Sequence, residues 1–221
     1  MEKKIVKIEV PNDWSAVTLR QYLALKKDMD AYKDEPEAVI ACLFHHLCKF
    51  PVEYVQKLDL ETYNAIVNDL TSFIQNVNLP LQREINIDGV AYGFEPDLSK
   101  MAYGAYVDIS KYKVLEINED WAEIMSILYR PIVKRSGIFY DTKDYNGYLD
   151  KETFMDVTMD VHFGAIFFFK TLLKDLLSST LNSLTEEMKN LPNMQSILEK
   201  SGEAIAQLSN SQTEILQKLK K

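Results

Sequence analysis

An Asp-Gly pair at positions 88 and 89 constrains the fold of this chain more than any other feature. It stands between two short runs that alternate apolar and polar residues, which predicts a β-hairpin with a two-residue turn. Both central residues of such a turn need positive φ, which Gly adopts freely and Asp tolerates. The predicted cross-strand pairs are Ile87 with Val90, Ile85 with Tyr92, and Phe94 with Arg83. A lone hairpin is marginally stable in water, so we expect the apolar face of residues 82–94 to pack against other elements.

Helical patterns flank the hairpin on both sides. Thr18 and Gln21 form a capping-box pair at the start of one predicted helix, and Asp59 can cap another. Pro36 suits the first turn of a helix, whereas Pro131 cannot continue one. The predicted helical ranges are 18–25, 36–47, a short helix from Pro51, 59–73, 101–107, 119–130 and 158–189.

Two further segments complete the predicted organisation. Residues 4–10 alternate apolar and charged side chains, which predicts a half-buried strand beside the hairpin, as the third strand of its sheet. Residues 136–149 are polar, aromatic and Gly-containing, and predict a loop. We therefore expect an α+β fold that is mainly α-helical. In it, residues 1–190 form a globular domain with a small antiparallel sheet made of the N-terminal strand and the central hairpin.

The last residues, 191–221, predict an amphipathic C-terminal helical tail. Leu191-Pro192 ends the preceding helix, after which apolar residues recur at alternating spacings of four and three, with polar interruptions at Ser201 and Gln212. A heptad-like helix with so little apolar area needs a partner, in the same chain or in another copy, and a frayed tail is the alternative interpretation. The candidate partner-binding residues of this tail are Leu198, Ile205, Leu208, Ile215 and Leu219.

The overall charge narrows the range of partners. A net charge of −8 and a pI near 5.0 give no electrostatic footprint for nucleic acid or for an anionic membrane, so we expect no direct binding to either. The most apolar run, residues 161–169, is about nine residues long, whereas a membrane span needs roughly 20. The N-terminal residues show no signal-peptide pattern, so we expect a soluble protein made inside the cell.

One cluster of potential metal ligands stands out in the sequence. On a helix, Cys42, His45 and His46 share a face, so their side chains could converge on one ion. Cys48 points away from that face, however, and no second cluster completes a tetrahedral site. Two buried free thiols with histidines at the helix margin are the simpler interpretation, and we expect no bound metal.

Catalytic signatures are absent from the sequence. Residues 144–147 are similar to the middle of a calcium loop, but Thr142 and Thr153 stand where that loop needs an Asp and a bidentate Glu. There is no phosphate-cradling Gly-rich loop, nucleophile elbow or HExxH helix. His162 lies inside the most apolar run, where we expect a core residue rather than a base. We therefore predict a non-enzymatic protein without a cofactor.

Three tyrosines follow the hairpin at spacings of three and six residues, namely Tyr103, Tyr106 and Tyr112. Tyrosine is enriched at protein interfaces, so these side chains are candidate partner-binding residues. The alternative interpretation is the half-buried face of a helix.

Four segments of the chain carry a resemblance to known proteins: VTLRQYLAL at 17–25, INIDGVAYGFEPDLSKMAYGAYVDI at 85–109, IMSILYRPIV at 124–133 and HFGAIFFFKTLLKDLL at 162–177. In these segments the chain resembles a family of tailed-bacteriophage morphogenesis proteins, the tail assembly chaperones. The resemblance concerns pattern and spacing up to about residue 189, and it carries over no catalytic residue. It implies an assembly factor in the host cytoplasm that binds another phage protein, which in these chaperones is the tape-measure protein.

A second role within phage assembly fits the same pattern. The chain could instead be a structural component of the virion, such as a connector, a ring or a packaged protein near the portal or tail. The heptad-like tail favours this alternative, because such a helix suits permanent assembly, including a homo-oligomer formed through the C-terminal helix.

Overall fold

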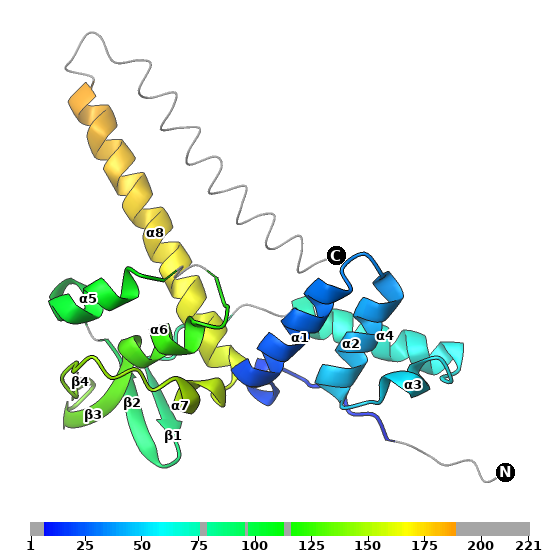
Figure 1. The fold of residues 1–221 in the computed structure, drawn as a ribbon. Helices are drawn as coiled ribbons and strands as arrows, with labels where there is room; N and C mark the ends of the chain where they lie inside the picture. Colours follow the sequence, from blue (N-terminus) through cyan, green and yellow to red (C-terminus); the bar gives the residue numbers. More distant parts are fainter. Residues whose placement is uncertain (1–6, 76–78, 96, 113–115, 189–221) are drawn as a thin grey trace. The chain divides into compact units, whose positions relative to one another are not determined.

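The computed structural model describes residues 7–75, 79–95, 97–112 and 116–188 (Figure 1). Contacts divide the chain into two compact units, Met1–Phe167 and Phe168–Lys221, so the boundary falls inside the long helix α8, Met159–Met188. The predicted tail, residues 191–221, lies outside the described residues together with its five candidate partner-binding residues. Its helix and its separation from residues 1–190 therefore stay predictions.

Four α-helices precede the sheet and begin where the sequence predicts. They are α1 (Leu19–Ala31), α2 (Pro36–Cys48), α3 (Val52–Val55) and α4 (Leu60–Gln75), and the short 3-10 helix η1 (Trp14–Ala16) comes before them. The capping box at α1 is formed, because the Thr18 hydroxyl accepts from the Gln21 N–H at 3.3 Å and the Gln21 side chain accepts from the Thr18 N–H at 2.9 Å. Asp59 likewise accepts from the Thr62 N–H at 2.9 Å and caps α4.

The sheet has four antiparallel strands in the order β1-β2-β3-β4 (Figure 1). Their bounds are Glu84–Ile87, Val90–Phe94, Tyr129–Ser136 and Phe139–Thr142. The predicted hairpin is confirmed, with Ile87 paired to Val90 across a turn in which Asp88 and Gly89 have φ values of 49° and 82°. The α+β, mainly α-helical class is confirmed as well.

The third strand is not the one that the sequence suggested. β3 pairs with β2, whereas residues 7–10 belong to no strand and residues 4–6 lie outside the described part. β3 follows directly on helix α6 (Trp121–Leu128), which brings Tyr129 opposite Phe94, and their rings meet edge to face at a centroid distance of 5.2 Å. This buried aromatic pair gives β3 the place that we expected residues 4–10 to fill.

The prediction of a loop over residues 136–149 is wrong for its first part. Residues 139–142 form β4, which pairs with β3 across a two-residue turn in which Gly137 has a φ of 63°. Tyr140 of β4 reaches across the sheet, and its single hydroxyl proton is shared between the carbonyl oxygens of Arg83 at 2.9 Å and Phe94 at 2.8 Å. These long-range contacts stabilise a strand whose four residues are too few for a clear alternation.

Of the remaining helices, three lie between β2 and β3 in the sequence and two follow β4. They are η2 (Leu98–Lys100), α5 (Tyr103–Ile109), α6, α7 (Lys151–Met155) and α8. α6 ends at Leu128, two residues earlier than predicted, because the chain turns into β3 before Pro131, which lies opposite Tyr92. No helix in the described part of the chain is long and apolar enough to cross a membrane.

The core of the first unit forms around α6 and the first turns of α8. Every residue of α6 except Glu123 is buried, and so are most residues of α8 from Met159 to Ile166. A second aromatic cluster joins η1, α4 and α8, because the Trp14 ring lies 4.4 Å from Phe73 and 4.9 Å from Phe163 between centroids. These rings tie the N-terminal segment to the start of α8.

Candidate interaction surface

Helix α5 presents two of the three predicted tyrosines as an exposed pair. Tyr103 is 80% exposed and Tyr106 is 62% exposed, whereas Ala105 between them is buried at 2%. Residues three apart lie on the same face of a helix, so both rings project from one side of α5. The helix has seven residues and no side-chain cap, so contacts with the rest of the chain must hold it in place.

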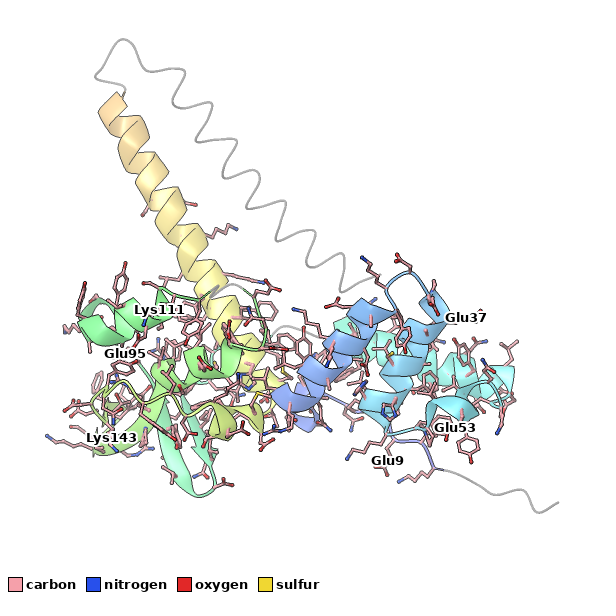
Figure 2. All side chains as sticks on the ribbon, viewed as in Figure 1. Glu9, Glu37, Glu53, Glu95, Lys111 and Lys143 are labelled. Atoms are coloured by element: carbon pink, nitrogen blue, oxygen red, sulfur yellow. The ribbon has the colours of Figure 1, made fainter. Side chains whose placement is uncertain are left out.

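Tyr145, in the segment after β4, supplies one of these contacts. Its hydroxyl donates to the Asp108 carboxylate, and its ring lies beside Gly104. Lys111 donates to the same carboxylate at 2.5 Å, and the two hydrogen bonds hold the pKa of Asp108 below its usual value (Figure 2 labels Lys111). Asp108 therefore stays ionised and anchors α5 to residue 145. Sequence reasoning did not single out Tyr145, because nothing local pairs it with a helix 37 residues away.

Tyr112 does not share the exposed face of the pair. It is half-buried, and its hydroxyl donates to Glu123 Oε2 at 2.6 Å. This hydrogen bond to a carboxylate, together with burial, raises the pKa of Tyr112 to about 12. Lys151 Nζ lies 3.7 Å from the other oxygen of Glu123. Tyr112 thus links the end of the α5 segment to α6, and its hydroxyl is already used.

A second exposed apolar region lies on the β3–β4 hairpin. Val133, Ile138 and Phe139 are 64%, 86% and 74% exposed, and we call these three residues the hairpin tip. Large apolar side chains that are exposed close together in the chain form a candidate interaction surface. None of the three was singled out by the sequence, and Ile138 and Phe139 lie in the segment 136–149 that was predicted as a loop.

A groove of about 500 Å³ lies between α1 and α7. Leu23, Ala24 and Met155 form the apolar part of its lining, and Lys26 donates to Glu116 Oε1 at 3.2 Å beside it. The other lining residues are Lys27, Asp30, Asn118, Glu119 and Lys151. Charges of both signs line the groove, so its electrostatics select no single class of ligand.

The cysteine and histidine residues of α2 have structural surroundings. Cys42 and Cys48 are buried free thiols, and burial raises the pKa of Cys48 to about 11, which makes it a poor nucleophile at neutral pH. His46 Nε2 lies 2.7 Å from Asp28 Oδ2 and joins α2 to α1. Within the described residues, no three His, Cys, Asp or Glu side chains are grouped as metal ligands would be.

His162 lies in the core, as its place in the apolar run predicts. It is fully buried, and its Nδ1 accepts a hydrogen bond from Trp121 Nε1 at 3.2 Å. Burial lowers the pKa of His162 to about 4, against the opposing effect of the carbonyls of Val157 and Phe154. The imidazole is therefore neutral at pH 7 and packed rather than open to a substrate.

No protein-family model matches the sequence, and comparisons with curated proteins and with solved structures gave no match.

Proposed function

We propose that this protein is a non-enzymatic phage assembly protein that binds another phage protein through α5, in the manner of a tail assembly chaperone. The observation that carries the proposal is the exposed pair Tyr103 and Tyr106. Tyrosine offers a large, stiff, amphipathic side chain that loses little conformational entropy on binding. Because both rings are exposed to water, they do not contribute to the core of this chain. They are available to pack against an apolar surface of a partner protein.

The surroundings of α5 support a binding role. Asp108 and Tyr145 hold the helix in place before any partner arrives, so the two rings are already presented on one face. Preorganisation of this kind lowers the entropic cost of association. A net charge of −8 favours solubility in a chain with an exposed aromatic surface. The same charge would favour the solubility of a complex with an apolar client. A tape-measure protein, with long apolar helices, is the client that the segment resemblance implies.

A structural component of the virion is the second candidate function. The heptad-like spacing of residues 191–221 favours it, since such a seam suits a permanent contact with another copy or with a neighbouring virion protein. A connector, ring or packaged protein near the portal or tail would be found in the particle, whereas a chaperone acts in the host cytoplasm and leaves.

Quantitative mass spectrometry separates the two functions. Purified particles of the phage that carries this gene are compared with lysate of infected cells. Abundant protein in the lysate and none in the particle is the result expected of a chaperone. A fixed copy number in each particle would contradict the chaperone and establish the structural role.

Co-expression tests the binding surface directly. The tape-measure protein of the same phage is expressed with this chain, and its soluble fraction is measured. We expect the wild type to keep the client soluble and the double variant Tyr103→Ser, Tyr106→Ser to lose that effect. Tyr54→Ser is the matched control, because Tyr54 is an exposed tyrosine on α3. If the client stays soluble with the double variant, α5 is not the binding surface.

A further inference from the structure

The hairpin tip, Val133, Ile138 and Phe139, is a rigid apolar projection. Arg135 Nη2 of β3 lies 2.6 Å from Glu84 Oε2 of β1. The Tyr140 hydroxyl of β4 reaches the carbonyl oxygens of Phe94 in β2 and of Arg83 just before β1, so the hairpin is tied to the other two strands. The turn itself needs a glycine only at position 137, where φ is 63°. Nothing in the local backbone therefore requires isoleucine at the neighbouring position, which is 86% exposed.

The residues around the hairpin tip carry a net positive charge, although the chain as a whole is acidic. Residues 130–143 contain four basic side chains and one carboxylate, a net charge of +3 in a chain whose total is −8, so the rest of the chain carries −11. Arg130 pairs with Glu95 and Arg135 with Glu84. Lys134 and Lys143 form no ion pair with any described residue, and both are exposed. Lys134 lies opposite Asp141 in the β3–β4 pairing, and basic side chains still outnumber this one carboxylate around the tip.

The turn between α1 and α2 has the complementary character. Four exposed carboxylates and one exposed lysine, Lys33, gather there, a net charge of −3 over residues 30–37. We call the four carboxylates the acidic corner: Asp30, Asp34, Glu35 and Glu37. Tyr32 in the same turn is 47% exposed, and its carbonyl accepts from the Glu35 N–H at 2.8 Å, which fixes the turn. None of the four carboxylates forms an ion pair within the part of the chain that the structure describes. Figure 2 labels Glu37 at this corner and Lys143 at the end of β4.

We propose that the hairpin tip of one copy docks on the acidic corner of a second copy. Ile138 and Phe139 would pack on the exposed Tyr32 ring, while Lys134 and Lys143 approach Asp34 and Glu35 at the rim. Apolar contact in the centre and opposite charges around it is the usual anatomy of a protein interface. The contact joins unlike surfaces, so it is heterologous and can repeat from copy to copy into a ring or filament. An anionic membrane fits less well, because the net charge of the chain opposes it.

Sedimentation of the full-length protein tests this contact. The mass is expected to rise above the 25.5 kDa of one chain as concentration increases, and to fall again in high salt. We expect Ile138→Ser with Phe139→Ser to weaken self-association by roughly tenfold or more. Leu60→Ser, at another strongly exposed position, should leave the mass unchanged. Circular dichroism confirms that each variant is folded.

Charge reversal identifies the two surfaces. We expect Lys134→Glu with Lys143→Glu to abolish self-association, and Asp34→Lys with Glu35→Lys to do the same, while a mixture of the two variants associates again. The substitutions Ile205→Ser and Leu208→Ser in the full chain separate this contact from the tail, and should leave the salt-sensitive association intact. A monomer at all concentrations, no recovery in the mixture, or loss of association through the tail substitutions would overturn the proposal. So would tip-dependent binding to phosphatidylserine vesicles by a monomer.

Discussion

Trp121 of α6 donates a hydrogen bond from its indole Nε1 to Nδ1 of His162 in α8, at 3.2 Å, and neither side chain has any exposed surface. An acceptor at Nδ1 places the proton of the neutral imidazole on Nε2. The pair joins two helices at the centre of the first unit. Its stability depends on the imidazole staying uncharged.

Acid is therefore expected to destabilise the fold through His162. The pKa of this histidine falls from 6.5 to about 4 on folding because of burial. Between these values the unfolded chain binds a proton that the folded chain does not, so the free energy of unfolding falls as pH decreases and is constant above 6.5. Across this window the loss amounts to about 3 kcal/mol. Urea titrations at several pH values measure it.

The matched variant for this prediction is His162→Asn, which keeps an acceptor near the Trp121 indole but does not titrate. Carboxylates that titrate in the same range contribute equally to both proteins, so the difference between the two pH profiles isolates the histidine. We expect the variant to show a flatter profile between pH 6.5 and pH 4. Parallel profiles would mean that His162 is not a source of acid sensitivity.

Gly164 lies where α8 meets the segment before β1, and its lack of a side chain matters for packing. A Cβ at this position would be 2.5 Å from the Pro80 carbonyl oxygen and 3.3 Å from the Leu81 Cα, both of which are backbone atoms. Gly164→Ala is expected to destabilise the protein by about 1–3 kcal/mol, because the backbone must shift to make room. Urea denaturation at neutral pH measures the change.

Gly104 in α5 provides the control for this substitution. A Cβ there meets only Tyr145 ring carbons, at 3.6 Å and beyond, which is ordinary van der Waals contact. Alanine is a better helix former than glycine by up to about 1 kcal/mol, so Gly104→Ala should be neutral or stabilising. Equal destabilisation by the two variants would show that helix context rather than the Pro80 contact decides the effect.

Gly93 of β2 leaves room for the Tyr140 ring, which crosses the sheet from β4. A Cβ on Gly93 would lie 2.3 Å from Tyr140 Cε2, so Gly93→Ala must displace a ring whose hydroxyl bonds two carbonyls. We expect a loss of about 1–3 kcal/mol in the wild type and less than about 0.5 kcal/mol in a Tyr140→Ala background. A double-mutant cycle from urea titrations gives both values. The same cost in both backgrounds would rule out the ring as the cause.

The elements that the sequence predicts correctly are those decided by close neighbours. Thr18 with Gln21, and Asp88 with Gly89, each contain within a few residues the groups that form the cap or the turn. The place of β3 depends instead on Tyr129 meeting Phe94, a contact between distant parts of the chain. Residues 4–10 alternate at least as clearly, so periodicity alone could not choose between the two segments.

The same division applies to the candidate surface. The spacing of Tyr103 and Tyr106 predicts a shared helix face, and both rings are exposed there. Tyr112 has the right residue type, yet its hydroxyl is taken by Glu123, which lies 11 residues further along. Residue type and spacing identify candidate tyrosines. Whether a tyrosine is exposed or already hydrogen-bonded depends on contacts between distant parts of the folded chain.

Glu95 and Arg130 form an ion pair that the surrounding protein almost covers, with side chains that are 10% and 13% exposed. Glu95→Gln would replace the carboxylate with a neutral amide. The guanidinium of Arg130 would then be nearly buried without an opposite charge beside it. Removing one member of a buried pair typically costs about 3 kcal/mol or more, so we expect a loss of about 3 kcal/mol in the free energy of unfolding. Urea denaturation at neutral pH measures it.

The sheet carries a matched control for burial. Glu84 and Arg135 pair at 2.6 Å with side chains that are 39% and 50% exposed, so water can solvate either charge when its partner is lost. Glu84→Gln should therefore cost less than about 1 kcal/mol. The replacement of both buried partners, Glu95→Leu with Arg130→Met, should cost less than Glu95→Gln alone, because no buried charge is left uncompensated. If Glu95→Gln and Glu84→Gln cost the same, burial does not set the strength of the pair at Arg130.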